Sequence, residues 1–484
     1  MDKPLDQKLI AKSVVTGSAA LLLRQVITFG FTFAGSVLLA RILTPAQFGG
    51  YAMILFVAAL SRLLVDGGLA ATLVQQTDEP TEIERSTVFS LQTIISIVVF
   101  LLLQLVIPIL SSLFAALPHF EIAIRRASVS LLAAPALGIC FALLERRLQF
   151  GRVGLLLSIQ PVVFNVLAVL LATAGWGILG LGVSLTVSTV LVVPFAVLSV
   201  RFLPRFGIHR GAMHGRFRFG LPFIGTNLIA TLKDSVNPIF IGIIFGPTVV
   251  GYINWAQQVA AMGVYLLFVL SRLLFPLFAR LRSNRQVLSD AVFNAVFWCN
   301  VTVAPVAVFI FVNVIDVTNM IFSSKWVPAI PTLLLLSVSN LISPTMVVLM
   351  ALMNALGKTT IPLLCSVGWF AGTWVFVPLF SSLLGFSGYG WANIAVGLLG
   401  IPLIVASREY LPLRRYSATF IPWLLAIVAM GVVFLIQQAL IPKSTIWTLL
   451  TSGFVGVTMF AGLLMVFEKS HVLGIWKVVK NVKT

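Results

Sequence analysis

The stretch LLARILTPAQFGGYA, Leu38 to Ala52, ends one long apolar run and opens the next. A second stretch, FIGIIFGPTVVGYINWA from Phe240 to Ala256, joins two later runs in the same way. Each places a glycine four residues after a proline, Pro45 to Gly49 and Pro247 to Gly251, with a tyrosine shortly after. A turn motif that recurs at the same kind of junction indicates an internal repeat.

The apolar runs themselves fix the class of protein. Of the 484 residues, 59% are hydrophobic and 10% are charged, against about 25% charged in a soluble domain. Runs of roughly 20 apolar residues are long enough to cross a bilayer as helices. They are continuous, whereas strands of a membrane barrel alternate polar and apolar residues. The sequence therefore predicts an all-α polytopic membrane protein with about 14 transmembrane helices.

The predicted spans are 15–39, 50–75, 87–112, 127–144, 154–174, 178–200, 221–245, 252–275, 291–313, 331–354, 361–383, 386–407, 418–439 and 447–467. Six spans separate the two copies of the turn motif, and an even number means that both copies enter the membrane in the same direction. The pattern predicts two six-helix lobes related by a parallel pseudo-two-fold repeat, plus two C-terminal helices.

A basic loop divides the predicted lobes. Residues 1–200 form the N-lobe with spans 1–6, and residues 201–220, RFLPRFGIHRGAMHGRFRFG, form a cytoplasmic inter-lobe loop. Residues 221–407 form the C-lobe with spans 7–12, and residues 408–484 hold spans 13–14 and a basic cytoplasmic tail.

The distribution of basic residues predicts the orientation. With a cytoplasmic N-terminus, 23 of the 32 Lys and Arg residues lie in cytoplasmic segments and 5 lie on the opposite side. Such a bias is typical of cytoplasmic loops, so both termini are expected inside. The bias also accounts for most of the formal net charge of +18 without a nucleic-acid partner.

Catalytic and metal-binding patterns are not apparent in the sequence. Cys140, Cys299 and Cys365 lie singly in separate apolar runs, and no Gly-rich phosphate loop for ATP is present. The predicted outer loops contain only Glu121 and Asp316 as acids. We therefore expect no enzyme activity, no metal and no cofactor.

Charged residues inside the predicted spans mark a candidate site. They are Arg24 beside Gln25, Arg62 with Asp66, and Lys233 with Asp234. A charge at the centre of a span costs roughly 2.5–3.5 kcal/mol on insertion scales, so it normally faces a partner or a hydrated cavity. Arg62 and Asp66 are neighbours along one helix face, whereas Lys233 and Asp234 are about 100° apart and are expected to point apart.

Two interpretations of these charges stay open. They are structural ion pairs that lock helices together, or they line a hydrated central cavity with three cations against two carboxylates. Tryptophans near the ends of spans likewise have two interpretations, an interfacial aromatic belt or sugar stacking. These are Trp176, Trp255, Trp326, Trp391, Trp423, Trp447 and Trp476.

Several segments resemble one transporter family. They are LLARILTPAQFGGYA, DGGLAATLVQQ in the second span, ERRLQFGRVG after the fourth, FPLFARLRSNRQ after the eighth and FSSKWVPAIPTLLLLSVSNLI entering the tenth. They are similar to the polysaccharide transporter (Wzx-type) flippase family of the multidrug/oligosaccharidyl-lipid/polysaccharide (MOP) exporter superfamily, and most closely to exporters of colanic-acid-type exopolysaccharide repeat units. The resemblance implies a two-lobed bundle of 12 or 14 helices in the bacterial inner (cytoplasmic) membrane. It would flip an undecaprenyl-diphosphate-linked oligosaccharide from the cytoplasmic to the periplasmic leaflet.

The same resemblance gives the charges an expected role. A diphosphate would be attracted to a cationic cavity, which makes Arg24, Gln25, Arg62 and Lys233 the expected substrate-binding residues. The carboxylates Asp66 and Asp234 are expected to couple transport to an ion, or to form charge pairs. Further expected partners are a proton or sodium ion, a polysaccharide polymerase and a chain-length regulator.

The alternatives to this function are an ion-coupled multidrug exporter, an exporter of another lipid-linked precursor in the same superfamily, and a non-transporting scaffold of a polysaccharide assembly complex. Exporters of cationic drugs favour acidic cavities, and a scaffold has no need of charges inside its spans.

Overall fold

The computed structural model describes residues 28–75, 79–114, 117–147, 149–200, 205–209, 228–440 and 445–469. The chain divides into two compact units, Met1–Gly251 and Tyr252–Thr484. The described residues form helices and turns only, as the continuous apolar runs predict. The predicted lobe boundary at residues 201–220 falls largely outside these ranges and stays a prediction.

Ten helices of the described ranges are long and apolar enough to cross a membrane, or 11 if one bent pair counts as a single span. They are Pro45–Asp66, Glu82–Ser112, Phe120–Arg146, Gly151–Thr173, Gly177–Val200, Leu228–Ala260, Arg285–Val312, Thr360–Ser407, Leu413–Leu440 and Ile446–Phe467, and the bent pair is Ser324–Ser339 with Ser343–Ala355. The protein is therefore a polytopic all-α membrane protein. The ranges Leu228–Ala260 and Thr360–Ser407 each join two predicted spans across a glycine with positive φ, Gly246 and Gly385. Counting each range as one span gives a lower number than the predicted 14.

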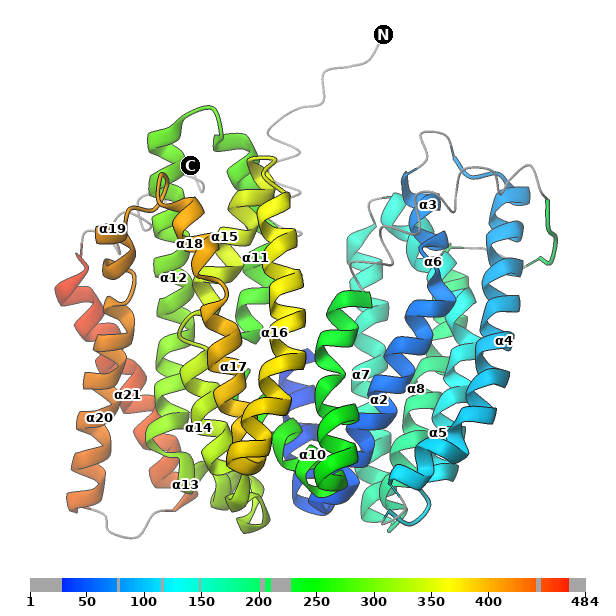
Figure 1. Cartoon of the computed structure of the whole chain (residues 1–484), viewed down its shortest axis with the longest axis horizontal. Coiled ribbons are helices and arrows are strands. Elements are labelled where there is room, and N and C mark those ends of the chain that lie inside the picture. Colours follow the sequence, from blue (N-terminus) through cyan, green and yellow to red (C-terminus); the bar gives the residue numbers. More distant parts are fainter. Residues whose placement is uncertain are drawn as a thin grey trace. The chain divides into compact units, whose positions relative to one another are not determined.

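The first unit is a helical bundle (Figure 1). After the helix Thr28–Ile42 it contains α2 (Pro45–Asp66), α3 (Leu69–Gln75), α4 (Glu82–Leu113), α5 (Phe120–Ser128), η1 (Val129–Ala133), α6 (Ala134–Arg146), α7 (Phe150–Thr173), α8 (Gly177–Val200), η3 (Asn237–Ile241) and the first part of α10 (Gly242–Ala260). α8 contacts α2, α5, α6 and α7. Its central place in the bundle brings the other helices around one interior.

The first turn motif is built from local hydrogen bonds. Thr44 caps α2, its hydroxyl accepting from the Gln47 N–H at 3.2 Å, while the Gln47 side chain accepts from the Thr44 N–H at 3.0 Å. Pro45 follows at the first helical position, where a proline costs no hydrogen bond. The second motif instead breaks inside α10 at Gly246, whose φ of 79° is a conformation that favours glycine. Pro247 then restarts the helix.

The two turn motifs contact one another within the first unit. A Cβ added to Gly49 would overlap the carbonyl oxygen of Pro247, and one added to Gly251 would overlap the carbonyl oxygen of Pro45. The glycines thus allow two helix backbones to approach closely, as small residues do between membrane helices. The contact is reciprocal, because the glycine of each motif meets the proline of the other.

Buried residues of α12 form the centre of a hydrophobic core in the second unit, whose helices are drawn in Figure 1. Beyond the rest of α10 it contains α11 (Tyr265–Leu281), α12 (Arg285–Val312), α13 (Val314–Asp316), η4 (Val317–Phe322), η5 (Ser324–Ala329), α14 (Ile330–Ser339), α15 (Ser343–Ala355), α16 (Thr360–Leu384), η6 (Gly385–Ser387), α17 (Gly388–Leu398), α18 (Ile401–Ser407), α19 (Leu413–Ala418), α20 (Ile421–Leu440) and α21 (Ile446–Phe467). α12 contacts α11, α15, α20 and α21.

Three tryptophans depart from the predicted interfacial belt. Trp255 and Trp326 are both buried and stack on one another, with ring centroids 5.3 Å apart. Trp423 is also buried, and its indole N–H donates to Asn300 Oδ1 at 3.0 Å. For these three residues both the belt and sugar stacking are wrong, because each ring packs inside the second unit. Trp176, Trp391 and Trp447 are exposed, and Trp476 lies outside the described residues.

Candidate functional site

An interior cavity of about 640 Å³ lies in the first unit. Helices α2, α4, α6, α7 and α8 contribute to its walls, together with Thr231. The lining residues are Leu55, Ala58, Ala59, Arg62, Leu63, Val65, Asp66, Gln92, Ala134, Leu137, Gly138, Phe141, Leu156, Leu157, Gln160, Leu185, Thr189, Val192 and Thr231. Most walls are apolar, with a few polar groups among them, which is typical of a small-molecule or head-group site.

Arg62 and Asp66 both line this cavity, as the charges in the second span predict. They come from the last two turns of α2, one helical turn apart. The described residues hold no ion pair between them, so the interpretation as a structural pair along one helix face is not realised. Asp66 is the last residue of α2, and the chain turns at Gly67 with φ 54°. Its carboxylate instead meets a side chain of α4.

That side chain is Gln92, which is 1% exposed. The Gln92 amide donates to Asp66 at two atoms, the carboxylate Oδ1 and the backbone carbonyl, both at 3.2 Å. A buried amide that donates to a carboxylate fixes the position of that carboxylate. Gln92 therefore ties the end of α2 to α4 at the cavity wall.

A second polar pair faces the cavity from α7 and α8. The Gln160 amide donates to the Thr189 hydroxyl at 3.0 Å, and both residues line the cavity. Sequence reasoning missed Gln92, Gln160 and Thr189, because single neutral polar residues in an apolar run carry no distinguishing charge. These residues lie on different helices, and only the folded structure shows that the helices place them around the same cavity.

Lys233 and Asp234 lie outside the lining of this cavity. Lys233 Nζ is 3.2 Å from Asp234 Oδ1, with side chains 41% and 77% exposed. The expectation that they point apart was wrong, since the long flexible lysine side chain spans the 100° between neighbours. The backbone just beyond them forms the π-helix η3, which contains Pro238.

The described residues that line the cavity have no net charge. Arg62 contributes one positive charge and Asp66 one negative charge. The predicted excess of positive charge therefore depends on Arg24, and both Arg24 and Gln25 lie outside the described residues. No carboxylate pairs with Arg62 in the described part of the chain, so its guanidinium has donors available for an anion.

Comparison with known proteins gives one family and one fold. The family model for polysaccharide biosynthesis proteins matches residues 38–331. The succinoglycan biosynthesis transport protein ExoT of Rhizobium meliloti (strain 1021) is 29% identical over 68% of this chain and 67% of that protein. The lipopolysaccharide biosynthesis protein WzxC of Escherichia coli (strain K12) is 24% identical over 83% of this chain and 81% of that protein.

Among solved structures, the lipid II flippase MurJ in an inward closed conformation superposes with a TM-score of 0.76. The match covers 95% of this chain and 100% of that one at 14% sequence identity. The likeness shows a shared fold.

Proposed function

Because this chain belongs to the family of polysaccharide biosynthesis proteins, a family of membrane transporters, we propose that it exports a lipid-linked oligosaccharide. The substrate is an undecaprenyl-diphosphate-linked repeat unit, which passes from the cytoplasmic to the periplasmic leaflet of the inner membrane. Similarity to ExoT and WzxC, whose names place them in succinoglycan and lipopolysaccharide biosynthesis, supports this substrate class.

The observation that carries the proposal is Arg62 in the interior cavity without a carboxylate partner in the described ranges. A guanidinium offers a planar fork of donors that fits phosphate oxygens. The amide of Gln160 and the hydroxyl of Thr189 suit hydroxyl groups on a sugar. In this proposal Arg24, Gln25 and Lys233 also contact the diphosphate or its sugars, while Asp66 and Asp234 sense a proton or sodium ion.

The proposed mechanism is alternating access of two six-helix lobes around a central cavity, in a bundle of 14 helices, with the cavity of the first unit contributing Arg62 to the substrate path. The reciprocal contact of the two turn motifs supports the underlying parallel repeat, because a two-fold axis would bring the glycine of each motif to the proline of the other. No phosphate-binding loop supplies energy from ATP, so movement is driven by an ion gradient or by the substrate gradient itself.

The first test removes the protein in a host that lacks a second flippase. Lipid-linked repeat units should then accumulate facing the cytoplasm, and polysaccharide export should stop. The measurement is the fraction of lipid-linked sugar that is accessible from the outer side of spheroplasts. Units that still reach the periplasmic leaflet would refute the proposal, and so would normal export.

The second test separates a substrate-binding role of Arg62 from a structural one. Arg62→Gln should reduce export per folded protein about tenfold or more, since a charge-assisted hydrogen bond is worth roughly 1.5–3 kcal/mol. Arg62→Lys should keep part of the activity, because the charge remains while the fork geometry is lost. Arg282→Gln, an exposed arginine just beyond α11, is the matched control. Normal specific activity of Arg62→Gln would remove the residue from the substrate path.

A further inference from the structure

A second cavity of about 630 Å³ lies between α7 and α8, where α7 begins and α8 ends. Its lining residues are Arg147, Arg152, Leu155, Leu156, Ile159, Phe195, Leu198, Ser199 and Val200. Both helices are long and apolar enough to cross a membrane. Because the cavity lies at their ends, it falls at the level where a bilayer changes from hydrocarbon to head groups.

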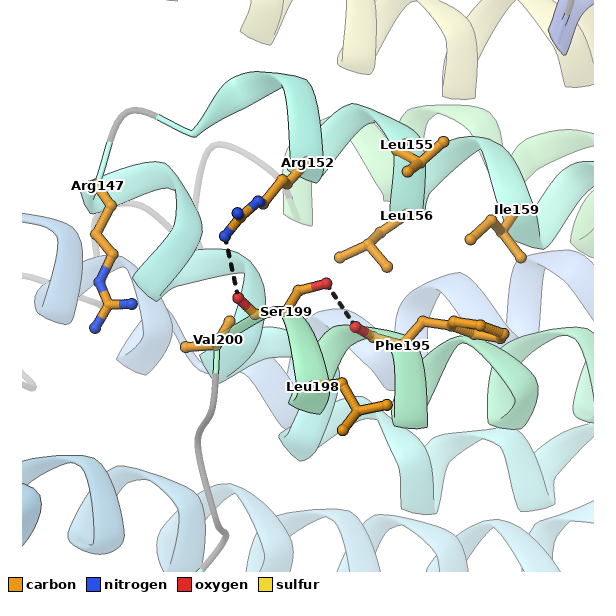
Figure 2. A pocket seen from close by; sticks show the side chains of 9 residues that line it. All are labelled: Arg147, Arg152, Leu155, Leu156, Ile159, Phe195, Leu198, Ser199 and Val200. Carbon is orange, nitrogen blue, oxygen red and sulfur yellow. Dashed lines mark hydrogen bonds between the residues drawn. The ribbon is translucent and has the colours of Figure 1, made fainter.

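The cavity has a charged end and an apolar end (Figure 2). Arg147 and Arg152 lie at one end, and Ile159 and Phe195 lie at the other. The apolar side chains also face outward, since Leu155 is 58%, Phe195 49% and Leu198 75% exposed. On a membrane-spanning helix, such outward apolar side chains are in contact with lipid chains. The arrangement matches an amphiphile, with its head at the arginines and its tail along the helices.

The charge of the lining is positive. Arg152 donates to the Gln149 side chain at 3.0 Å and to the Ser199 carbonyl at 3.4 Å, which holds its guanidinium at the cavity. Ion pairs of the described residues involve neither Arg147 nor Arg152, and none of the nine lining residues is acidic. The cavity thus offers two guanidinium groups to an anion and no carboxylate to an ammonium group.

We propose that this cavity binds the head group of an anionic phospholipid, with the phosphate between Arg147 and Arg152. One acyl chain follows Leu155, Ile159 and Phe195 toward the middle of the bilayer. A head group of the phosphatidylglycerol type fits, because it bears a negative charge and lacks an amine. Zwitterionic head groups place an ammonium where the lining supplies only positive charge, so they bind more weakly.

The test uses the full-length protein, purified in detergent and analysed by native mass spectrometry with phosphatidylglycerol or phosphatidylcholine. The wild-type protein should retain one tightly bound phosphatidylglycerol molecule, and its affinity for phosphatidylcholine at this site should be lower. Arg147→Gln with Arg152→Gln should lose that molecule, with its affinity falling about tenfold for each guanidinium removed. Arg280→Gln with Arg282→Gln, two exposed arginines outside this cavity, is the matched control and should bind like the wild type.

Two further measurements keep the outcome clear. Arg147→Lys with Arg152→Lys should retain most of the binding, since lysine also holds phosphate as a point charge. Circular dichroism and the unfolding temperature confirm that each variant is folded. The proposal is overturned if the double Gln variant binds phosphatidylglycerol normally, if the control loses it equally, or if the Lys pair loses it fully. Binding of glycerol phosphate as tightly as phosphatidylglycerol would also overturn it, since the acyl chain would then contribute nothing and the site would recognise phosphate without a lipid.

Discussion

At the scale of single residues, the interior cavity depends on one buried amide. Gln92 donates to both the side chain and the backbone of Asp66, so it holds the end of α2 against α4. Its own Oε1 is buried without a hydrogen-bond partner in the described part of the chain. The NH2 group of Gln92 is therefore hydrogen-bonded to Asp66, whereas its Oε1 can still accept a hydrogen bond beside the cavity.

The first prediction is that Gln92→Leu destabilises the protein. Removing the donor leaves Asp66 without this partner at a half-buried position, which costs about 1–3 kcal/mol. The unfolding temperature in detergent should fall. Thr93→Val is the control, because the Thr93 hydroxyl donates to the Phe89 carbonyl of its own helix, and its effect should be small. An unchanged unfolding temperature for Gln92→Leu would show that the amide does not hold α2.

The residues also show what a sequence can indicate about such a site. Charges inside apolar runs are costly, so the sequence singled out Arg62 and Asp66 but left open whether they form an ion pair or line a cavity. Their partners could not be assigned in this way, because Gln92 comes from another helix and a glutamine in an apolar run has many structural reasons to exist. The relation between Lys233 and Asp234 was predicted wrongly, since helix geometry fixes the Cβ directions but not the reach of a lysine.

At the scale of elements, apolar runs predicted most helices, and glycines decided where they break. The helical segment Leu228–Ala260 is interrupted at Gly246, which the turn motif located correctly. The sequence could not show that the motif at Pro45 and the motif at Pro247 touch. Contact between segments 202 residues apart in the sequence depends on the path of the whole chain.

The second prediction concerns that contact. Gly49→Ala and Gly251→Ala should each destabilise the protein by roughly 1–3 kcal/mol, because the new methyl group meets backbone atoms that cannot rotate away. Gly151→Ala is the control, as nothing lies within 4 Å of its Cβ position near the start of α7. The control should be neutral or slightly stabilising, since alanine favours helix over glycine. Equal yields and unfolding temperatures for all three variants would contradict the close approach.

At the scale of the whole molecule, the orientation in the membrane follows from the loops. The bias of 23 basic residues against 5 predicts that Gly215 and Ser324 lie on opposite sides of the bilayer. Cysteines at these two positions, in a protein without Cys140, Cys299 and Cys365, should label from opposite sides. The reagent must be membrane-impermeant, and permeabilised cells control for access. Labelling of both positions from outside would refute the 14-span topology.

The two cavities of the first unit share one lining residue, Leu156. This side chain is 3% exposed and belongs to the linings of both the interior cavity and the arginine-bearing cavity. A change in the size of this one side chain should therefore alter both cavities at once, so that occupancy of one is linked to the shape of the other.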